Sequence, residues 1–319
     1  MKLKELAKRA NVSVSTASKA LSGSKELNDE TIAHVLSVAE QSGYFTERKR
    51  LRQTLVKDKG IVAIIVQEIV SVHYSVMATK ISEKLKEKGI GSQIYITNFD
   101  SKTRKEILYD CLKTANVNGV ICMSATNVEF ADFPIISIRE KDGFNVAVKD
   151  AVQHLKDLGH KEIVYIGEKL TNSKMQCVLS AMEELGIKTS ENNRIVSEHR
   201  FERAGYYAVE QLVKENRIPT ALICAYDEIA FGAISALIKH GIKVPEDVSV
   251  VGINDVPSAK FFPVPLTTIS VSLEDCYEEI INQVKHFSKG VKNQTDFSAK
   301  LKLIVRNSTA IAKNKYPPV

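Results

Sequence analysis

The sequence of 319 residues lacks the features that mark membrane, secreted and metal-binding proteins. No stretch approaches the ~20 consecutive apolar residues that a membrane-spanning helix needs. The amino terminus is charged and amphipathic, unlike a secretory signal. The five cysteines are scattered and include no C-x-x-C pair, so they indicate reduced thiols rather than a disulfide framework or a zinc site. We therefore expect a cytoplasmic protein with no metal site and no membrane partner.

The motifs of nucleotide-binding and catalytic sites are missing as well. No G-x-G-x-x-G motif follows a predicted strand and there is no P-loop, so we expect no nucleotide cofactor. No serine stands in a G-x-S-x-G motif, and the seven histidines are dispersed along the chain. Without a catalytic constellation, the sequence does not predict an enzyme.

The positive charge is concentrated at the amino terminus. Residues 1–60 contain twelve Lys and Arg against seven acids, a net charge of +5, whereas the whole chain carries +6. The remaining 259 residues are therefore almost neutral. A surface that binds DNA needs such a local excess to neutralise phosphates. A solvated basic face, the ordinary alternative, does not explain why the excess is confined to one segment.

Residues 3–43 predict three short helices. Ser13 is placed to cap the second helix, Asn28 starts the third, and Gly43 suits its end. The expected inner face of the first two helices is Leu3, Leu6, Ala7, Ala10, Ala17, Ala20 and Leu21. The outward residues of the second helix are Val14, Ser15, Thr16, Ser18 and Lys19. Small polar groups on an exposed helix are typical of a major-groove reader, although the spacing alone also fits an ordinary helical subdomain.

This segment resembles the DNA-binding headpiece of the lactose-repressor (LacI/GalR) family. The resemblance is carried by Leu3, Glu5, Leu6, Ala7, Ala10, Val12, Ser13, Thr16, Ser18, Lys19, Leu21 and Ser22. It implies that bases are read by Val14, Ser15 and Lys19, and that phosphates are contacted by Ser13, Thr16 and Ser18. Lys19 stands where the family more often has Arg, so a two-point grip on guanine becomes a single-point contact.

The predicted hinge, residues 47–59, departs from the family pattern. The family usually continues with a short helix that inserts a leucine into the minor groove, and of that pattern only Tyr44 is kept. Arg48 and Arg50 would bind phosphates or enter a narrowed groove, and Leu51 could replace the inserted leucine in a shifted register. A flexible basic linker is an equal alternative.

From Gly60 onward, short apolar runs alternate with amphipathic segments, which is typical of parallel α/β sheets. The expected strands are residues 61–66, 93–97, 119–123, 135–138, 163–166, 221–225 and 248–252. The expected helices are residues 77–88, 105–114, 147–158, 174–185, 203–215, 228–240 and 273–288.

Four segments of this core are also similar to the LacI/GalR family: HLKDLGHKEI (154–163), IPTALICAYDEIAFG (218–232), VPEDVSVVG (244–252) and PLTTI (265–269). The resemblance implies the architecture of type I periplasmic binding proteins, with two doubly wound lobes, three crossover strands and an effector cleft between the lobes. The expected domains are a headpiece (1–46), the hinge, an N-lobe (60–143 and 270–298) and a C-lobe (144–269 and 299–319).

Effector-binding candidates in the C-lobe follow from the resemblance position by position. Lys174 takes the place of an effector-binding Arg, and Tyr226 with Asp227 replaces an Asn-Asp pair. Asn254 stands where an Asp commonly binds sugar hydroxyls. These exchanges keep the capacity for hydrogen bonding but remove an anion, so the site should tolerate a phosphorylated or acidic sugar.

In the N-lobe, polar residues follow the predicted strands at positions where ligands approach open sheets. The candidates are Gln67, Glu68, His73, Tyr74, Ser124 and Arg139. For each of them, a solvated loop residue is an equal alternative.

Three classes of protein compete: a regulator, a solute-binding receptor and an enzyme. A receptor would share the core but has no use for a helix-turn-helix. We therefore expect a sequence-specific transcriptional regulator, a repressor of a carbohydrate-utilisation operon, that binds double-stranded operator DNA as a homodimer. Its effector would be a sugar or sugar derivative, including phosphorylated or acidic ones. The family builds tetramers with a carboxyl-terminal leucine heptad, and the ending AIAKNKYPPV has none; its paired prolines also oppose a helix.

Overall fold

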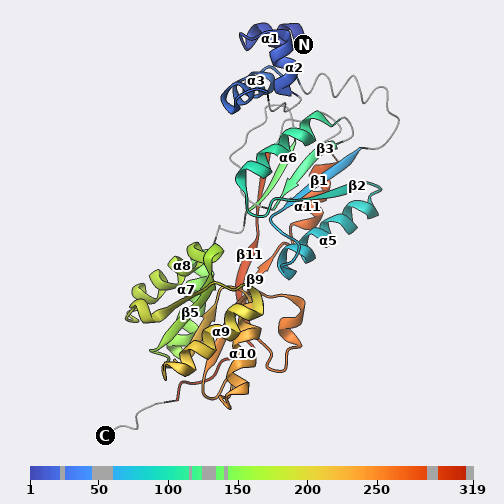
Figure 1. Cartoon of the computed structure of the whole chain (residues 1–319). Helices are drawn as coiled ribbons and strands as arrows, with labels where there is room; N and C mark the ends of the chain where they lie inside the picture. The colour runs from blue at the N-terminus through green and yellow to red at the C-terminus, as the bar shows by residue number, and fades with distance from the viewer. Residues whose placement is uncertain are drawn as a thin grey trace. The chain divides into compact units, whose positions relative to one another are not determined.

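The computed structural model describes residues 1–21, 26–44, 60–114, 117–123, 134–139, 143–285 and 294–313. The chain divides into two compact units (Figure 1). The first unit comprises Met1–Arg139 and Glu274–Ser298, and the second comprises Glu140–Leu273 and Ala299–Val319. The chain thus passes three times from one unit to the other.

Three helices form the headpiece, as predicted: α1 (Leu3–Arg9), α2 (Val14–Leu21) and α3 (Asp29–Gln41). Asn11 has a φ of +51°, which ends α1 and lets the chain turn into α2. Small side chains allow the helices to pack closely, and the buried cluster is Ala7, Ala10, Ala17, Ala20 and Val35. The amide of Asn28 caps α3 by accepting a hydrogen bond from the backbone N–H of Thr31 at 2.8 Å.

The core of the first unit is a five-stranded parallel sheet in the order β10-β4-β3-β1-β2. The α11 helix returns to this unit and lies beside α5 (Figure 1). Lys84 on α5 forms an ion pair with Glu278 on α11, and Lys80 pairs with Glu274, just before α11; 194 residues separate the partners of each pair. The elements are β1 (Ile61–Val66), α5 (Val72–Glu87), β2 (Gly91–Ile96), α6 (Ser101–Lys113), β3 (Val117–Cys122), β4 (Ile135–Arg139), α11 (Tyr277–Val284) and β10 (Gln294–Ser298).

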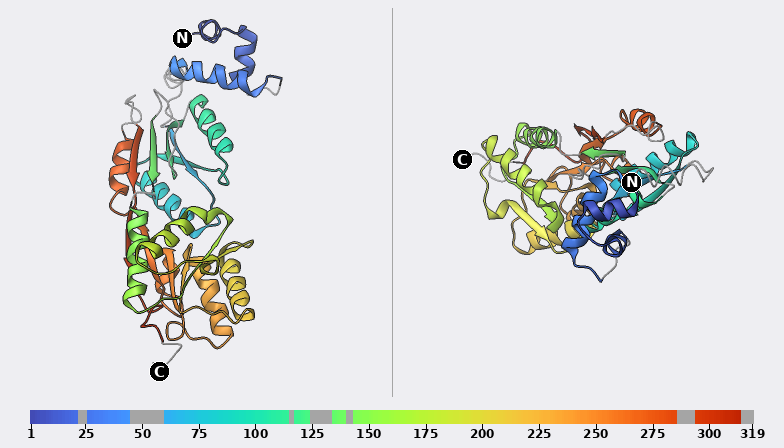
Figure 2. Two further views of the ribbon diagram at one scale, coloured as in Figure 1. Left: turned by 90° about the vertical axis from the view of Figure 1, so that its left-hand side faces the viewer. Right: turned by 90° about the horizontal axis from the view of Figure 1, so that it is seen from above.

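The second unit holds a six-stranded sheet in the order β11-β9-β8-β7-β5-β6, parallel except for β11. In both Figure 1 and Figure 2, α9 and α10 lie side by side on this unit. Its strands are β5 (Ile163–Glu168), β6 (Arg194–Ser197), β7 (Ala221–Cys224), β8 (Ser249–Asn254), β9 (Thr267–Ser272) and β11 (Lys300–Ile304). Its α-helices are α7 (Phe144–Asp157), α8 (Asn172–Glu184), α9 (Phe201–Lys214) and α10 (Asp227–Lys239). Short 3-10 helices are η1 (Lys169–Thr171), η2 (Glu191–Asn193) and η3 (Pro257–Lys260).

The α9 and α10 helices cross at two glycines. A β-carbon on Gly205 would lie 1.8 Å from the carbonyl oxygen of Ile229, and one on Gly232 would lie 1.8 Å from that of Glu202. Any side chain at either position would therefore push the two backbones apart. The close crossing fixes the start of α9, which carries residues of the site described below.

The predicted α/β class and the two doubly wound sheets are confirmed, with several corrections. The strands β6, β9, β10 and β11 were not predicted. Polar residues, mainly Ser, Thr, Asp and Lys, interrupt their apolar residues, so none of the four forms a continuous apolar run. The helix expected over residues 273–288 begins only at Tyr277, so its predicted start is wrong; residues 286–288 lie outside the described part. Several helices begin earlier than predicted, since polar first turns hide the start: Asp100, for example, caps α6 through the N–H groups of Lys102 and Thr103.

Among the described residues, no helix has both the length and the apolar character that a membrane crossing requires.

Candidate DNA-binding and effector sites

The α2 helix presents the predicted reading face. Val14 is 44% exposed, and Ser15, Ser18 and Lys19 are exposed as well, whereas Thr16 is half-buried. Ala17 and Ala20, on the opposite side, are fully buried. The helix is thus anchored by its alanines and shows short side chains outward, a geometry in which base edges can approach the helix closely.

Ser13 holds the start of this helix. Its Oγ accepts a hydrogen bond from the backbone N–H of Thr16 at 2.9 Å and lies 2.8 Å from the Thr16 hydroxyl. Ser13 is therefore the N-cap that the sequence predicts. A hydroxyl already engaged in capping can still accept or donate one further bond, so a phosphate contact at Ser13 stays a prediction.

Lys19 forms an ion pair with Glu26, which lies just before α3. Both side chains are largely exposed, so the pair is weak and can open when DNA competes for the ammonium group. The remaining predicted DNA contacts, Arg48, Arg50 and Leu51, lie outside the described residues.

The effector candidates of the second unit gather at one edge of its sheet. Because β5, β7 and β8 are parallel, their carboxyl ends meet at the same edge, which we call the carboxyl edge. Lys174, on α8, donates from Nζ to the carbonyl oxygen of Ala225 at 3.1 Å, directly beyond β7. Its ammonium also lies 5.9 Å from the ring centroid of Phe144. Lys174 therefore lies next to the residue that precedes Tyr226, and contact of either side chain with an effector stays a prediction.

Two residues at this edge, Glu168 and Arg200, were not predicted from the sequence. Glu168, the last residue of β5, is 4% exposed and accepts a bond from Nε of Arg200 at 3.2 Å. The hydroxyl of Tyr226 lies 3.4 Å from the same Glu168 oxygen and accepts a bond from the backbone N–H of Phe201. Burial raises the pKa of Tyr226, so the phenol keeps its proton. No local pattern joins residues 168, 200 and 226; only the strand order does.

Asp227, at the start of α10, is buried and bonded to the protein through both of its carboxyl oxygens. Its side chain is completely buried, and its two oxygens accept bonds from the backbone N–H of Val256 (2.8 Å) and the hydroxyl of Thr268 (2.6 Å). Burial raises its pKa to about 8. Both oxygens thus serve the protein, and direct contact between Asp227 and an effector stays a prediction.

Asn254 lies in the turn that Asp227 anchors. It is 9% exposed with a φ of +109°, and the next residue, Asp255, has a φ of +54°. Non-glycine residues in this region are strained, and the surrounding structure must hold them there. Arg306 does so by an ion pair with Asp255 at 2.6 Å. The strained turn positions the Asn254 side chain at the carboxyl edge.

Of the N-lobe candidates in the first unit, Gln67 and Glu68 follow β1 and Arg139 ends β4, whereas His73 and Tyr74 lie in the first turn of α5. Glu68 and His73 are buried, while the ring of Tyr74 lies 6.4 Å from that of Phe99. Ser124 lies outside the described residues.

Two buried polar atoms near the carboxyl ends of β1 and β4 have no hydrogen-bond partner among the described residues. Within the part of the chain that the structure describes, neither the buried Gln67 Oε1 nor the buried Arg139 Nε has a partner, although Arg139 forms an ion pair with Asp296 at 2.6 Å. Buried polar atoms are normally paired, so these two are suited to a ligand.

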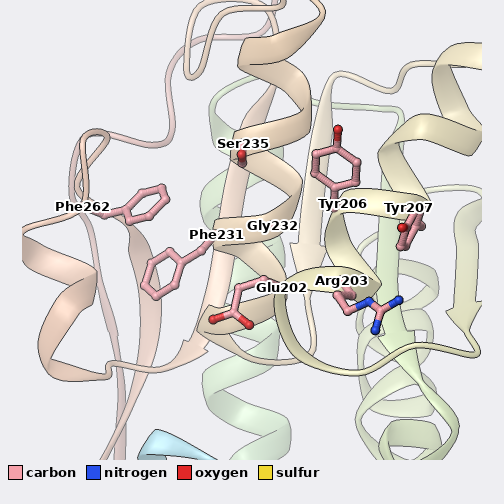
Figure 3. Close-up of a pocket in the computed structure, with 8 residues that line it drawn as sticks. All are labelled: Glu202, Arg203, Tyr206, Tyr207, Phe231, Gly232, Ser235 and Phe262. Carbon is pink, nitrogen blue, oxygen red and sulfur yellow. The ribbon is translucent and has the colours of Figure 1, made fainter.

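A second feature of the second unit is an open groove of about 380 Å³ beside the α9–α10 crossing (Figure 3). Phe231 and Phe262 stack at one end, with ring centroids 4.4 Å apart. Tyr206 and Tyr207 lie on α9 at the other side, as Figure 3 shows. The lining is completed by Glu202, Arg203, Gly232 and Ser235. Sequence reasoning missed this surface, because its aromatic residues come from three separate segments.

Comparison with known proteins matches both parts of the chain. Residues 2–47 match the family model of bacterial regulatory proteins of the lacI family, and residues 152–309 match a periplasmic binding protein-like domain. The chain is 27% identical over 332 residues to the HTH-type transcriptional repressor PurR of Haemophilus influenzae, covering 96% of this chain and 98% of that protein. It is 29% identical over 343 residues to the HTH-type transcriptional regulator DegA of Bacillus subtilis, covering 96% and 97%.

Solved structures show the same fold. A lac repressor dimer bound to operator and the anti-inducer ONPF matches with a TM-score of 0.66 and 20% identity, covering 97% of this chain and 99% of that chain. A LacI family transcriptional regulator from Lactobacillus casei with bound glucose matches with a TM-score of 0.68 and 22% identity, covering 78% and 100%.

Proposed function

This chain belongs to the LacI/GalR family of DNA-binding transcriptional repressors, and from that premise we propose that it controls a carbohydrate-utilisation operon in response to a small effector. The observation that carries the proposal is the α2 helix, capped by Ser13 and exposing Val14, Ser15 and Lys19 above a buried alanine seam. A solute-binding receptor would need only the core and would leave this helix without a purpose.

In the second unit, the proposed effector contacts are Lys174, Tyr226 and Asn254, near the carboxyl ends of its strands. In the first unit, the proposed contacts are Gln67 after β1 and Arg139 at the end of β4. A sugar or sugar derivative fits such a set of hydrogen-bonding groups. The related regulator from Lactobacillus casei with bound glucose supports this class of ligand. An effector changes operator affinity only if it binds more tightly to one of two conformations of the protein, the one that binds operator or the one that does not. The coupling free energy between two such sites is typically about 1–3 kcal/mol.

Binding to the operator is proposed to require a homodimer, because two-fold symmetric half-sites need two headpieces. The groove beside α9 and α10 supports this, since it exposes aromatic rings next to an acid, Glu202, and a base, Arg203. In a two-fold contact the same patch faces itself, so the acid of one copy can meet the base of the other. The operator-bound lac repressor of the same fold is also a dimer.

The proposal is tested by selecting DNA from the source genome with the full chain and measuring retardation of the recovered sites at several salt concentrations. We expect palindromic sites whose affinity falls steeply with salt. The control is a chain without residues 1–59, which should not retard the same DNA. If that truncated chain binds the sites equally well, the headpiece is not the reader and the proposal is wrong. Sugars are then added to the complex to find those that release or strengthen it.

A further inference from the structure

We infer that Asp227 is a positioning residue that links the turn of Asn254 to the aromatic groove beside α9 and α10, so that an effector bound at the turn changes the dimer contact. The inference rests on the proposed function, in that it assumes an effector near Asn254 and a two-fold contact at the groove. It comes from the segment between the two, residues 254–262, which we call the connector and which α10 holds at both ends.

The first end of the connector is held by a buried carboxyl group. The backbone N–H of Val256 donates to Oδ2 of Asp227 at 2.8 Å, and the Asp227 side chain is completely buried. A β-carbon on Gly252, in β8, would lie 2.2 Å from Oδ1 of Asp227, so only a glycine leaves room for the carboxyl group there. Because a buried N–H is costly to leave without an acceptor, Val256 stays attached to α10.

The second end of the connector is held by an aromatic stack. The ring of Phe262 lies on that of Phe231, with centroids 4.4 Å apart and an angle of 22° between the planes (Figure 3). Phe231 follows Asp227 by four residues on α10, so the two side chains lie on one face of the helix, one turn apart. A single helix face therefore holds the connector at the turn and at the groove.

The connector is also bonded along its length. The N–H of Ala259 donates to the carbonyl oxygen of Val256 at 2.8 Å, and the N–H of Phe262 donates to that of Ser258 at 2.9 Å. The carbonyl oxygen of Ala259 accepts from the N–H of Leu266 at 2.8 Å, and Ala259 itself is completely buried. Packed and hydrogen-bonded segments of this kind carry coupling between sites, so a displacement of the turn reaches Phe262.

The turn at the start of the connector is strained. Asn254 and Asp255 have φ angles of +109° and +54°, which non-glycine residues keep only where the surrounding structure holds them. A ligand that binds Asn254 better in one conformation of the turn than in another shifts the balance between the two. Through the connector, the same shift changes how Phe262 is presented in the groove. By linkage, dimerisation changes effector affinity by the same factor.

The test observes the groove while the turn is changed. The full chain is labelled with para-fluorophenylalanine at its 11 phenylalanines, and the fluorine NMR resonances of Phe262 and Phe231 are assigned by their loss in Phe262→Leu and Phe231→Leu. Asn254→Gly relieves the strain and loosens the turn, because glycine adopts positive φ freely. We expect it to shift both resonances and to change the dimer dissociation constant, measured by sedimentation of diluted protein, by about fivefold or more.

Asn216→Gly is the matched control, because Asn216 is also an asparagine with positive φ, +50°, but lies exposed after α9 and outside the connector. It should leave both resonances in place. Asp227→Ala should shift them, whereas Asp227→Asn, which keeps an acceptor for the N–H of Val256, should restore them. Thr268→Val removes only the bond to Oδ1 of Asp227, so it should lower stability without the same shift. A purely structural role of Asp227 would make Asp227→Ala and Thr268→Val alike.

The inference is overturned if Asn254→Gly leaves both resonances in place, or if Asn216→Gly shifts them as far. If Asp227→Ala does not fold, Asn254→Gly and its control decide the question. Retardation of operator DNA by the same preparation reports separately on the proposed function. A protein that dimerises and binds operator but keeps both resonances in place in Asn254→Gly defeats only the inference. One whose resonances respond to Asn254→Gly but that binds no operator DNA defeats only the proposed function.

Discussion

The hydroxyl of Thr268 donates a 2.6 Å hydrogen bond to Oδ1 of Asp227 in the interior of the second unit. The bond joins the start of α10 to the strand β9, 41 residues further along the chain. The other Asp227 oxygen holds the backbone N–H of Val256, just after the strained turn of Asn254. A single buried carboxyl group thus ties a helix, a strand and a site turn together.

Asp227→Asn is expected to change how stability depends on pH. The folded-state pKa of Asp227 is raised to about 8, above its unfolded value, so its contribution to stability is fully present below about pH 4 and is lost as pH rises to about 8. The original protein should lose stability relative to the variant between about pH 4 and about pH 8, and no further above the folded pKa. Urea denaturation of both proteins across this range checks the prediction, and parallel curves would contradict it.

Ser13→Ala is expected to destabilise the headpiece by about 1 kcal/mol, because the N–H of Thr16 loses its capping acceptor. Operator affinity should fall as the first turn of α2 frays. Ser15→Ala is the matched control for hydrogen exchange only, because Ser15 is an exposed neighbour of the cap and its predicted contact with a base can change operator affinity by itself. Hydrogen exchange of the headpiece amides in the full chain measures the effect. Equal exchange rates in the two variants would remove Ser13 from the capping role.

Lys19→Ala is expected to relax the choice of base at one position of each half-site, at a cost of roughly 1–3 kcal/mol for the preferred base pair. Its outward position on α2 and its exposed ion pair with Glu26 leave the ammonium able to reach DNA. Arg48→Ala, in the predicted hinge, should instead weaken all sequences about equally. Competition binding against operators with single substitutions distinguishes the two. Uniform weakening by Lys19→Ala would show a phosphate contact instead.

Gly205→Ala is expected to destabilise the second unit, although alanine is the better helix former by up to about 1 kcal/mol. The added β-carbon would lie 1.8 Å from the carbonyl oxygen of Ile229, and overpacking of this kind costs about 1–3 kcal/mol or more. Gly143→Ala is the control, because a β-carbon there meets nothing within 4 Å and only its φ of +85° is unfavourable. Thermal unfolding should therefore show the larger loss for Gly205→Ala.

Phe262→Glu is expected to convert the dimer to a monomer, because the groove would then bring two acids together at a two-fold contact. Light scattering at micromolar concentration should give about twice 35.4 kDa for the original protein and about 35.4 kDa for the variant. Ile311→Glu, at a highly exposed apolar residue outside the groove, should remain dimeric. A tetramer, or a variant that remains dimeric, would contradict the proposed interface.

Local elements were predictable because their causes lie close together in the chain. The caps Ser13 and Asn28 act on residues three positions away, and strands such as β1 are continuous apolar runs buried on both faces. By contrast, β9 contains Thr267 and Thr268, whose polar groups are satisfied inside the fold by Ser308 and Asp227. Without those distant partners, its sequence does not look like a buried strand.

The sequence by itself determined the headpiece, the α/β class and the family, because these depend on local periodicity, capping and motif matches; it also proposed Lys174, Tyr226 and Asn254 as effector contacts. Only the tertiary structure decided which charged groups are buried and which are paired. It buried Asp227 and Glu168, and it brought Arg200 to the Glu168 carboxylate from 32 residues away. Burial and pairing depend on the order of strands in the sheet, and that order is set by packing between distant segments of the chain.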